Sequence, residues 1–164
     1  MNTLEQDINK LSYMSFKDLK ELHQNEIIKK YFDVSKDTLT GIEHIFKGEL
    51  QSSNIIGYHT EIILPNLYQQ DMMDSNLALD KTKPYNLELP DGKLTSCFPI
   101  TMSPTDVVIA VLKTYQQALK NPPMNEMCSN WKRSYCLPEY GFDIQVVMKE
   151  KQKIFDSYPI ISMH

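Results

Sequence analysis

The strongest helix signal in the sequence is SPTDVVIAVLKTYQQALK, residues 103–120. Ser103 has the chemistry of an N-cap, Pro104 stands at the first helical position, and Asp106 follows the cap by three residues, as in a capping box. Apolar residues then recur at helical spacing: Val107, Val108, Val111, Leu112, Tyr115 and Leu119. The Asn-Pro-Pro sequence that follows ends the helix. We therefore predict a helix over this stretch that packs its apolar side against a sheet.

A β-hairpin is predicted at the C-terminus. Four apolar residues alternate with more polar ones, which is the period of a half-buried strand: Phe142, Ile144, Val146 and Met148. The charged run KEKQK at residues 149–153 favours a turn, and IFDSYPII follows it as a second strand.

Helices are predicted for residues 3–31. Leu4, Ile8 and Leu11 recur at helical spacing, and Ser15 is a candidate cap for a second apolar run: Leu19, Leu22, Ile27 and Ile28. Residues 62–91 show little periodicity, which indicates a long excursion with at most short strands. The order of elements favours an α+β class, with a helical leader over residues 1–40 and a second region over residues 41–164.

Composition narrows the class of protein. The chain has 164 residues, of which 41% are hydrophobic and 23% charged, as expected for one globular domain with a hydrophobic core. A net charge of -4 argues against a protein that coats nucleic acid through bulk positive charge. An enzyme that binds a few nucleotides in one groove needs only a local basic site. We expect no membrane interaction, because no run approaches the ~20 apolar residues of a membrane span.

The three cysteines do not indicate a disulfide framework or a zinc site. Cys97, Cys128 and Cys136 are widely spaced, and no Cys-x-x-Cys sequence occurs. We expect reduced thiols packed as small apolar side chains. A single Cys128–Cys136 bridge is the alternative.

Two of the four histidines, His44 and His59, have similar surroundings, with an apolar side chain and a glycine close by. A histidine pair can cleave RNA near neutral pH. One neutral imidazole removes the proton from the ribose 2′-hydroxyl, and one imidazolium protonates the departing 5′-oxygen. The alternative is that both are ordinary surface or half-buried histidines.

Three further residues suit the same chemistry. Lys93 and Ser96 offer an ammonium and a hydroxyl close together in the sequence, and an ammonium can stabilise the charge that builds on a phosphorane. Tyr158, in the second strand of the predicted hairpin, offers an aromatic face for a nucleobase. Taken singly, a solvated turn lysine and a core tyrosine are the ordinary explanations of Lys93 and Tyr158.

The flanking sequences resemble one family, the EndoU uridylate-specific endoribonucleases. GIEHIFKGE at residues 41–49 resembles the first histidine motif, and GYH at residues 57–59 resembles the second. KLTSCFP at residues 93–99, followed by Ser103-Pro104, resembles the lysine segment and the start of the next helix. DSYP at residues 156–159 resembles the closing strand. The resemblance runs in order along most of the chain.

The resemblance implies N-terminal helices followed by two small antiparallel sheets that flank a catalytic cleft. It also implies metal-independent cleavage of single-stranded RNA 3′ of uridine, which leaves a 2′,3′-cyclic phosphate and needs no cofactor. By the resemblance, His59 is the general base, His44 the general acid and Lys93 the electrostatic stabiliser. Ser96 and Tyr158 then contact the uridine.

The size and helical leader are most similar to the toxic C-terminal domains of bacterial polymorphic and contact-dependent toxins. This similarity implies a secreted or delivered toxin domain that acts in the target-cell cytoplasm. Its expected partners are an RNA substrate and a cognate immunity protein.

The sequence departs from the family at Asp156, where the family commonly has Thr or Ser, so a carboxylate replaces a hydroxyl that would hold the uracil. Ser157 is one position away. Lysine spacing varies in the family, which leaves Lys81 and Lys83 as substitutes for Lys93.

Two alternative functions remain open. One is a metal-dependent nuclease in which both histidines act with acidic residues: Glu43, Glu49 or Glu61. The other is a degenerate EndoU-like module that binds RNA or protein without catalysis.

Overall fold

The computed structural model of the chain describes residues 3–17, 19–32, 41–46, 49–51, 54–56, 81–88, 92, 94–124, 130–149 and 153–161. Its helices are α1 (Leu4–Leu11), α2 (Leu19–Gln24), α3 (Glu26–Phe32), α4 (Gly41–Phe46) and α6 (Pro104–Leu119). Its strands are β1 (Glu49–Gln51), β2 (Asn54–Ile56), β3 (Tyr85–Glu88), β4 (Leu94–Cys97), β5 (Asn130–Cys136), β6 (Asp143–Lys149) and β7 (Lys153–Pro159).

All described strand pairs are antiparallel: β1 with β2, β3 with β4, and β5, β6 and β7 in that order in a three-stranded sheet. The predicted α+β class, with N-terminal helices and small antiparallel sheets, is confirmed. The catalytic cleft between sheets stays a prediction.

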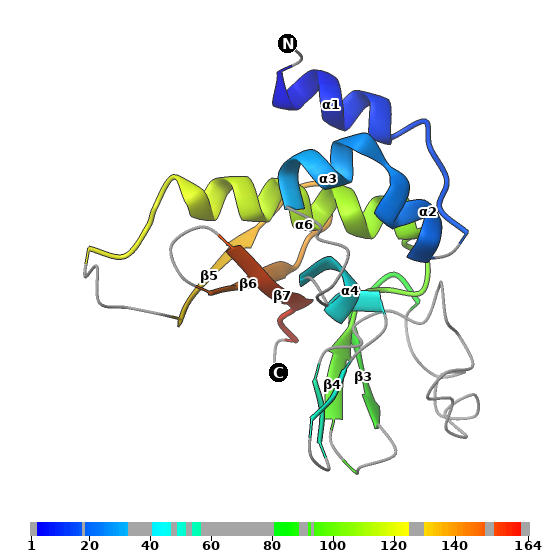
Figure 1. The fold of residues 1–164 in the computed structure, drawn as a ribbon. Coiled ribbons are helices and arrows are strands. Elements are labelled where there is room, and N and C mark those ends of the chain that lie inside the picture. Colours follow the sequence, from blue (N-terminus) through cyan, green and yellow to red (C-terminus); the bar gives the residue numbers. More distant parts are fainter. Residues whose placement is uncertain are drawn as a thin grey trace.

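Helix α6 lies at the centre of the fold. Its capping box is formed as predicted: the Asp106 amide donates to Ser103 Oγ at 3.1 Å, and the Ser103 amide donates to Asp106 Oδ2 at 2.9 Å. The helix is buried nearly all round rather than on one side. The reason is that the sheet β5–β7 covers one side while α1–α3 cover another (Figure 1).

The leader helices share this hydrophobic core. Leu11, Leu22 and Ile28 are fully buried in the same cluster as α6 and the sheet, and the Phe32 ring stacks on Tyr115 of α6 at 5.8 Å. The predicted division of the chain at residue 40 stays a prediction.

The second helical run of the leader differs from its prediction. It forms two helices, α2 and α3, and Asn25 rather than Ser15 caps α3. The Asn25 side-chain oxygen accepts hydrogen bonds from the amides of Ile27 and Ile28 at 2.9 and 3.1 Å. A short polar side chain that satisfies two amides favours a new helix start at this position.

The predicted C-terminal hairpin is confirmed as β6 and β7. Strand β5 was not predicted. Its inward positions are Trp131, Arg133 and Tyr135, so a charged residue interrupts the apolar alternation. The Arg133 guanidinium lies 5.0 Å from the Trp131 ring, and its Nε donates to the Asn121 carbonyl at 3.1 Å, which explains how this face accepts a cation.

A β-bulge in β7 positions the residues discussed below. Val147 of β6 pairs with Asp156, but the next residue, Met148, pairs with Ile154, so Phe155 is an additional residue in β7. Ile144, Val146 and Met148 point into the core with zero exposure. The opposite face of the sheet, here called the outer face, carries the alternate residues of β6 and their register partners on β5 and β7. These residues of β6 are Asp143, Gln145, Val147 and Lys149.

Strands β3 and β4 form a separate hairpin. Between them, Gly92 has a φ of +85°, a left-handed conformation that favours glycine. Cys97 is a free thiol buried in the fold, as expected, whereas Cys136 is a free thiol but exposed rather than packed. Cys128 lies outside the described residues. In the described part of the chain, no helix is long and apolar enough to span a membrane.

Candidate functional site

The side chain of His44 is held between α4 and β7. Ile45 and Phe46 beside it are fully buried and anchor the short helix, and His44 itself is only 2% exposed. Its Nδ1 lies 2.6 Å from the carbonyl oxygen of Phe155, a residue 111 positions away. A carbonyl only accepts hydrogen bonds, so Nδ1 carries a proton and donates it. Proton exchange with any ligand is thereby left to Nε2.

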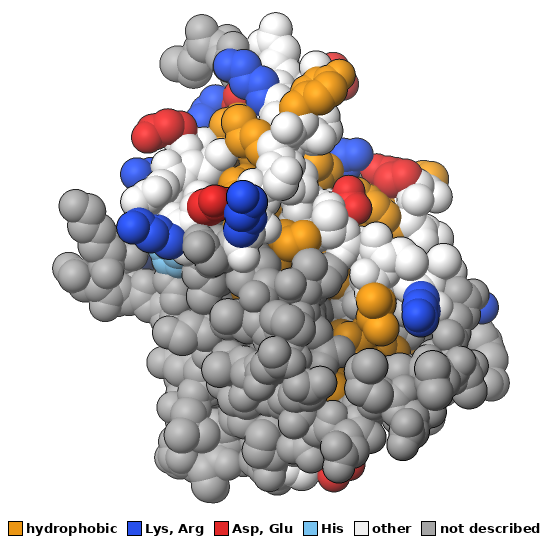
Figure 2. All heavy atoms as spheres, turned by 90° about the vertical axis from the view of Figure 1, so that its right-hand side faces the viewer, with side chains coloured by type: hydrophobic (Ala, Val, Ile, Leu, Met, Phe, Trp, Pro, Cys, Tyr) orange, Lys and Arg blue, Asp and Glu red, His pale blue; other side chains and the backbone are white. Residues whose placement is uncertain are grey.

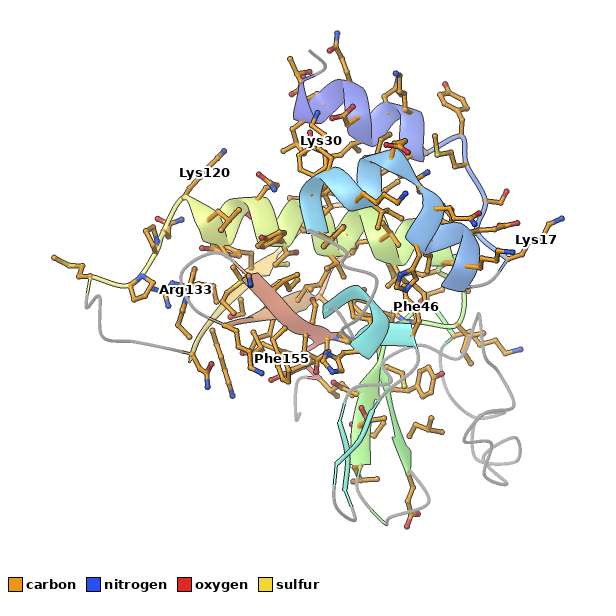
Figure 3. All side chains as sticks on the ribbon, viewed as in Figure 1. Lys17, Lys30, Phe46, Lys120, Arg133 and Phe155 are labelled. Carbon is orange, nitrogen blue, oxygen red and sulfur yellow. The ribbon has the colours of Figure 1, made fainter. Side chains whose placement is uncertain are left out.

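Phe155 links His44 to a lysine. Its ring centroid lies 4.6 Å from that of His44, with the ring planes tilted by 58°. The Nζ atom of Lys149 lies 4.2 Å from the centroid of the same Phe155 ring. Figure 3 shows Phe155 on β7 beside α4, where Phe46 is labelled. One aromatic ring therefore separates the imidazole from an exposed ammonium group.

Asp156 is buried on the outer face of the sheet, next to the bulge. Asp156 is only 6% exposed, and its Oδ1 accepts a hydrogen bond from the Ser157 amide at 2.9 Å. The Ser157 hydroxyl points the other way and donates to the Gln145 carbonyl at 2.9 Å. The Ser157 hydroxyl therefore lies on the opposite side of β7 from Asp156 and Tyr158.

Tyr158 lies on the same face as Asp156 and opposite Gln145 of β6. The Gln145 side-chain amide donates to Tyr158 Oη at 2.6 Å. Burial raises the pKa of Tyr158, the Asp156 carboxylate raises it further, and the Gln145 hydrogen bond opposes both effects. The phenol is therefore neutral near pH 7, which suits an aromatic platform for a nucleoside.

Ser96 lies on β4, which contacts β7. Thr95 and Cys97 point to the buried face of their hairpin, so Ser96 points to the opposite face with its register partner Asn86, and it is half-buried there. The strands that carry Ser96 and Tyr158 are therefore neighbours.

The other predicted catalytic residues, His59 and Lys93, lie outside the described residues. The substitutes Lys81 and Lys83 are exposed in the turn before β3, where the Lys81 carbonyl accepts hydrogen bonds from Thr101. Of the predicted site, the structure thus joins His44, Asp156 and Tyr158 through one strand, β7.

Three residues of this region were missed from the sequence: Gln145, Lys149 and Phe155. Gln145 is recognised only once strand register sets it opposite Tyr158. Phe155 is the additional residue of the bulge and contacts His44, and no local sequence pattern predicts a bulge. The lysine-rich sequence KEKQK was a signal for Lys149, but it was interpreted only as a turn.

Among the described residues, no group of three or more His, Cys, Asp or Glu side chains could hold a metal ion. The side chains of Glu43, Glu49, His59 and Glu61 lie outside that part of the chain. In comparisons with known proteins, no family model matches the chain, and neither a curated protein nor a solved structure matches it.

Proposed function

We propose that the chain is an EndoU-like endoribonuclease that cleaves single-stranded RNA 3′ of uridine by transesterification to a 2′,3′-cyclic phosphate. The proposal rests on the sequence motifs and on one structural observation, the hydrogen bond from His44 Nδ1 to the Phe155 carbonyl. This bond fixes the imidazole tautomer and leaves Nε2 as the group that exchanges protons. The strand that accepts the bond also carries Asp156 and Tyr158.

In the proposed reaction, two imidazoles transfer the protons. His59 takes the 2′-hydroxyl proton, the 2′-oxygen attacks phosphorus, and the 5′-oxygen leaves with a proton from His44 Nε2. Lys93 is proposed to stabilise the phosphorane charge, while Ser96 and Tyr158 hold the uridine.

The experiment is incubation with an RNA that contains a single uridine, in the presence of excess chelator. The expected result is cleavage 3′ of the uridine with a 2′,3′-cyclic phosphate end. A matched RNA with 2′-deoxyuridine at that position lacks the nucleophile and should remain intact. Cleavage of the deoxy substrate at an undiminished rate would refute the two-histidine mechanism, because water or a metal hydroxide would then be the nucleophile.

A second candidate function is RNA or protein binding without catalysis, which the burial of His44 favours. An imidazole that is 2% exposed, packed on a phenylalanine and hydrogen-bonded to a carbonyl also fits a structural histidine. This candidate predicts that the uridine RNA is bound but not cut. The same incubation therefore distinguishes the two functions.

We further propose that the domain acts as a bacterial toxin in the target-cell cytoplasm and has a cognate immunity protein. This proposal is supported only by the sequence resemblance to bacterial toxin domains. Expression in a bacterial cell should arrest growth, and His59→Ala should relieve the arrest. Harmless expression of a protein that cleaves RNA in vitro would contradict the proposal.

A further inference from the structure

Three exposed lysines share the outer face of the sheet β5–β7. Lys149 and Lys153 are direct register partners across β6 and β7. Lys132 on β5 pairs with Val147, two residues before Lys149 in β6, so it lies on the same face one row away. Side chains directly opposite one another in an antiparallel pair approach within about 5 Å at Cβ.

This arrangement concentrates positive charge. Like charges directly opposite each other destabilise a sheet, and none of the three lysines forms an ion pair within the described part of the chain. Two described acidic residues occupy this face: Asp156 is buried and accepts the Ser157 amide, and Asp143 is exposed at the opposite end of β6 from Lys149. The whole chain carries a net charge of -4, so the face is locally opposite in sign to the protein.

Another side of the molecule has a mixed charge distribution. In Figure 2, the described Lys, Arg, Asp and Glu side chains are interspersed and form no region of one sign. Within the described part of the sheet, the three lysines lie together at one end of the outer face and none of them has an ion-pair partner, an arrangement that favours a polyanionic ligand.

The lysines are continuous with the proposed site. The Lys149 ammonium lies on the Phe155 ring, which packs on His44. Tyr158 lies on the same strand as Lys153, roughly 15 Å away at the usual rise per residue. An RNA strand with its uridine at Tyr158 reaches Lys153 only through the phosphates of further nucleotides.

We propose that Lys132, Lys149 and Lys153 bind backbone phosphates of nucleotides beyond the cleaved bond, so that the preferred substrate is a single-stranded oligonucleotide rather than a dinucleotide. This inference rests on the proposed function. A sheet face with aromatic side chains beside basic ones is typical of proteins that bind single strands, since neither depends on a duplex groove.

The first test measures binding of a fluorescent RNA decamer that carries 2′-deoxyuridine at the cut site. The variant replaces all three lysines by Gln, and a matched control replaces Lys10, Lys17 and Lys20, which are exposed in the helical leader far from β7 (Figure 3 labels Lys17). Each phosphate contact contributes about 0.7 to the slope of log affinity against log salt, so the sheet variant should lose about 2 from the slope. A rise from 50 to 200 mM salt should then weaken the wild type about 20-fold more than the variant.

The second test compares cleavage of a uridine decamer with that of a uridine dinucleotide. The sheet variant should raise KM for the decamer several-fold more than KM for the dinucleotide, whereas the control variant should match the wild type on both. Thermal unfolding of both variants checks that they are folded.

The outcomes separate the two proposals. Cleavage by the wild type with an unchanged slope and KM in the sheet variant would overturn the phosphate contacts and leave the proposed function standing. Binding without cleavage would overturn the proposed function, while the slope would still decide the role of the lysines. Failure of the wild type to bind the decamer, or equally tight binding of poly-glutamate, would assign the face to something other than RNA and overturn the inference.

Discussion

The hydrogen bond between His44 and Phe155 allows the structural and chemical roles of His44 to be separated by two substitutions. His44→Asn retains a side-chain N–H close to the position of Nδ1, so the donor to the Phe155 carbonyl is preserved. It removes Nε2, the atom proposed to transfer the proton. His44→Ala removes both.

The expected losses of stability differ between the variants. Alanine leaves a buried carbonyl without its donor, which costs about 1–3 kcal/mol, and removes the ring contact with Phe155, which adds about 0.5–1.5 kcal/mol. Asparagine loses only the ring contact and some packing. We therefore expect a decrease in the free energy of unfolding of about 2–4 kcal/mol for His44→Ala and about 1 kcal/mol for His44→Asn.

The expected losses of activity are the same for both variants. One positioned proton transfer contributes about 10²- to 10⁴-fold, so both should slow RNA cleavage by that amount. Urea unfolding measures the stability of each variant, and initial rates with a fluorogenic uridine RNA measure the activity.

Two results would refute the reasoning. Wild-type activity in His44→Asn would show that Nε2 transfers no proton. Equal destabilisation by both substitutions would show that the Nδ1 donor is not what the fold requires at this position.

Three further predictions concern other residues. Asp7 is buried and accepts hydrogen bonds from Lys30 Nζ at 2.7 Å and Tyr31 Oη at 2.5 Å. Asp7→Ala should therefore lower the free energy of unfolding, measured by urea titration, by about 2 kcal/mol. The control Glu5→Gln, at an exposed position, should leave it unchanged. Burial raises the pKa of Tyr140 to about 12, so the folded state keeps a proton that the unfolded chain loses near ~10. The free energy of unfolding should therefore be constant below pH 10 and fall as the pH rises toward 12. Tyr140→Phe should reduce this fall, and an equal fall in the variant would contradict the prediction. Tyr158→Leu should raise KM for the uridine substrate about 5-fold or more because base stacking is lost, whereas Tyr158→Phe should keep the wild-type KM. Identical kinetics in the wild type and both variants would exclude a stacking role.

Local signals in the sequence were sufficient for several elements. The capping box at Ser103 and the apolar spacing after it predict α6, because a helix start depends on residues only three positions apart. Alternation from Phe142 to Met148 and a charged turn predict the β6–β7 hairpin for the same reason. The α+β class follows from the order of these elements.

Strand β5 and the surroundings of His44 depended on the tertiary structure. Arg133 breaks the apolar alternation of β5, and its acceptance inside the fold depends on Trp131 and on a carbonyl of the preceding loop. The sequence motif alone selects His44, but its tautomer is set by a carbonyl 111 residues away. That carbonyl belongs to Phe155, the additional residue of the bulge in β7.

The candidate site shows the same division. The residue types His44, Asp156 and Tyr158 and their order along the chain are properties of the sequence, and the proposed chemistry depends on them. Which of them meet is decided by strand register, since a shift of one residue moves a side chain to the opposite face of a sheet. Register sends Ser157 toward the core and Tyr158 to Gln145, and it sets Lys149 opposite Lys153. These contacts join residues distant in sequence, so only the folded chain determines them.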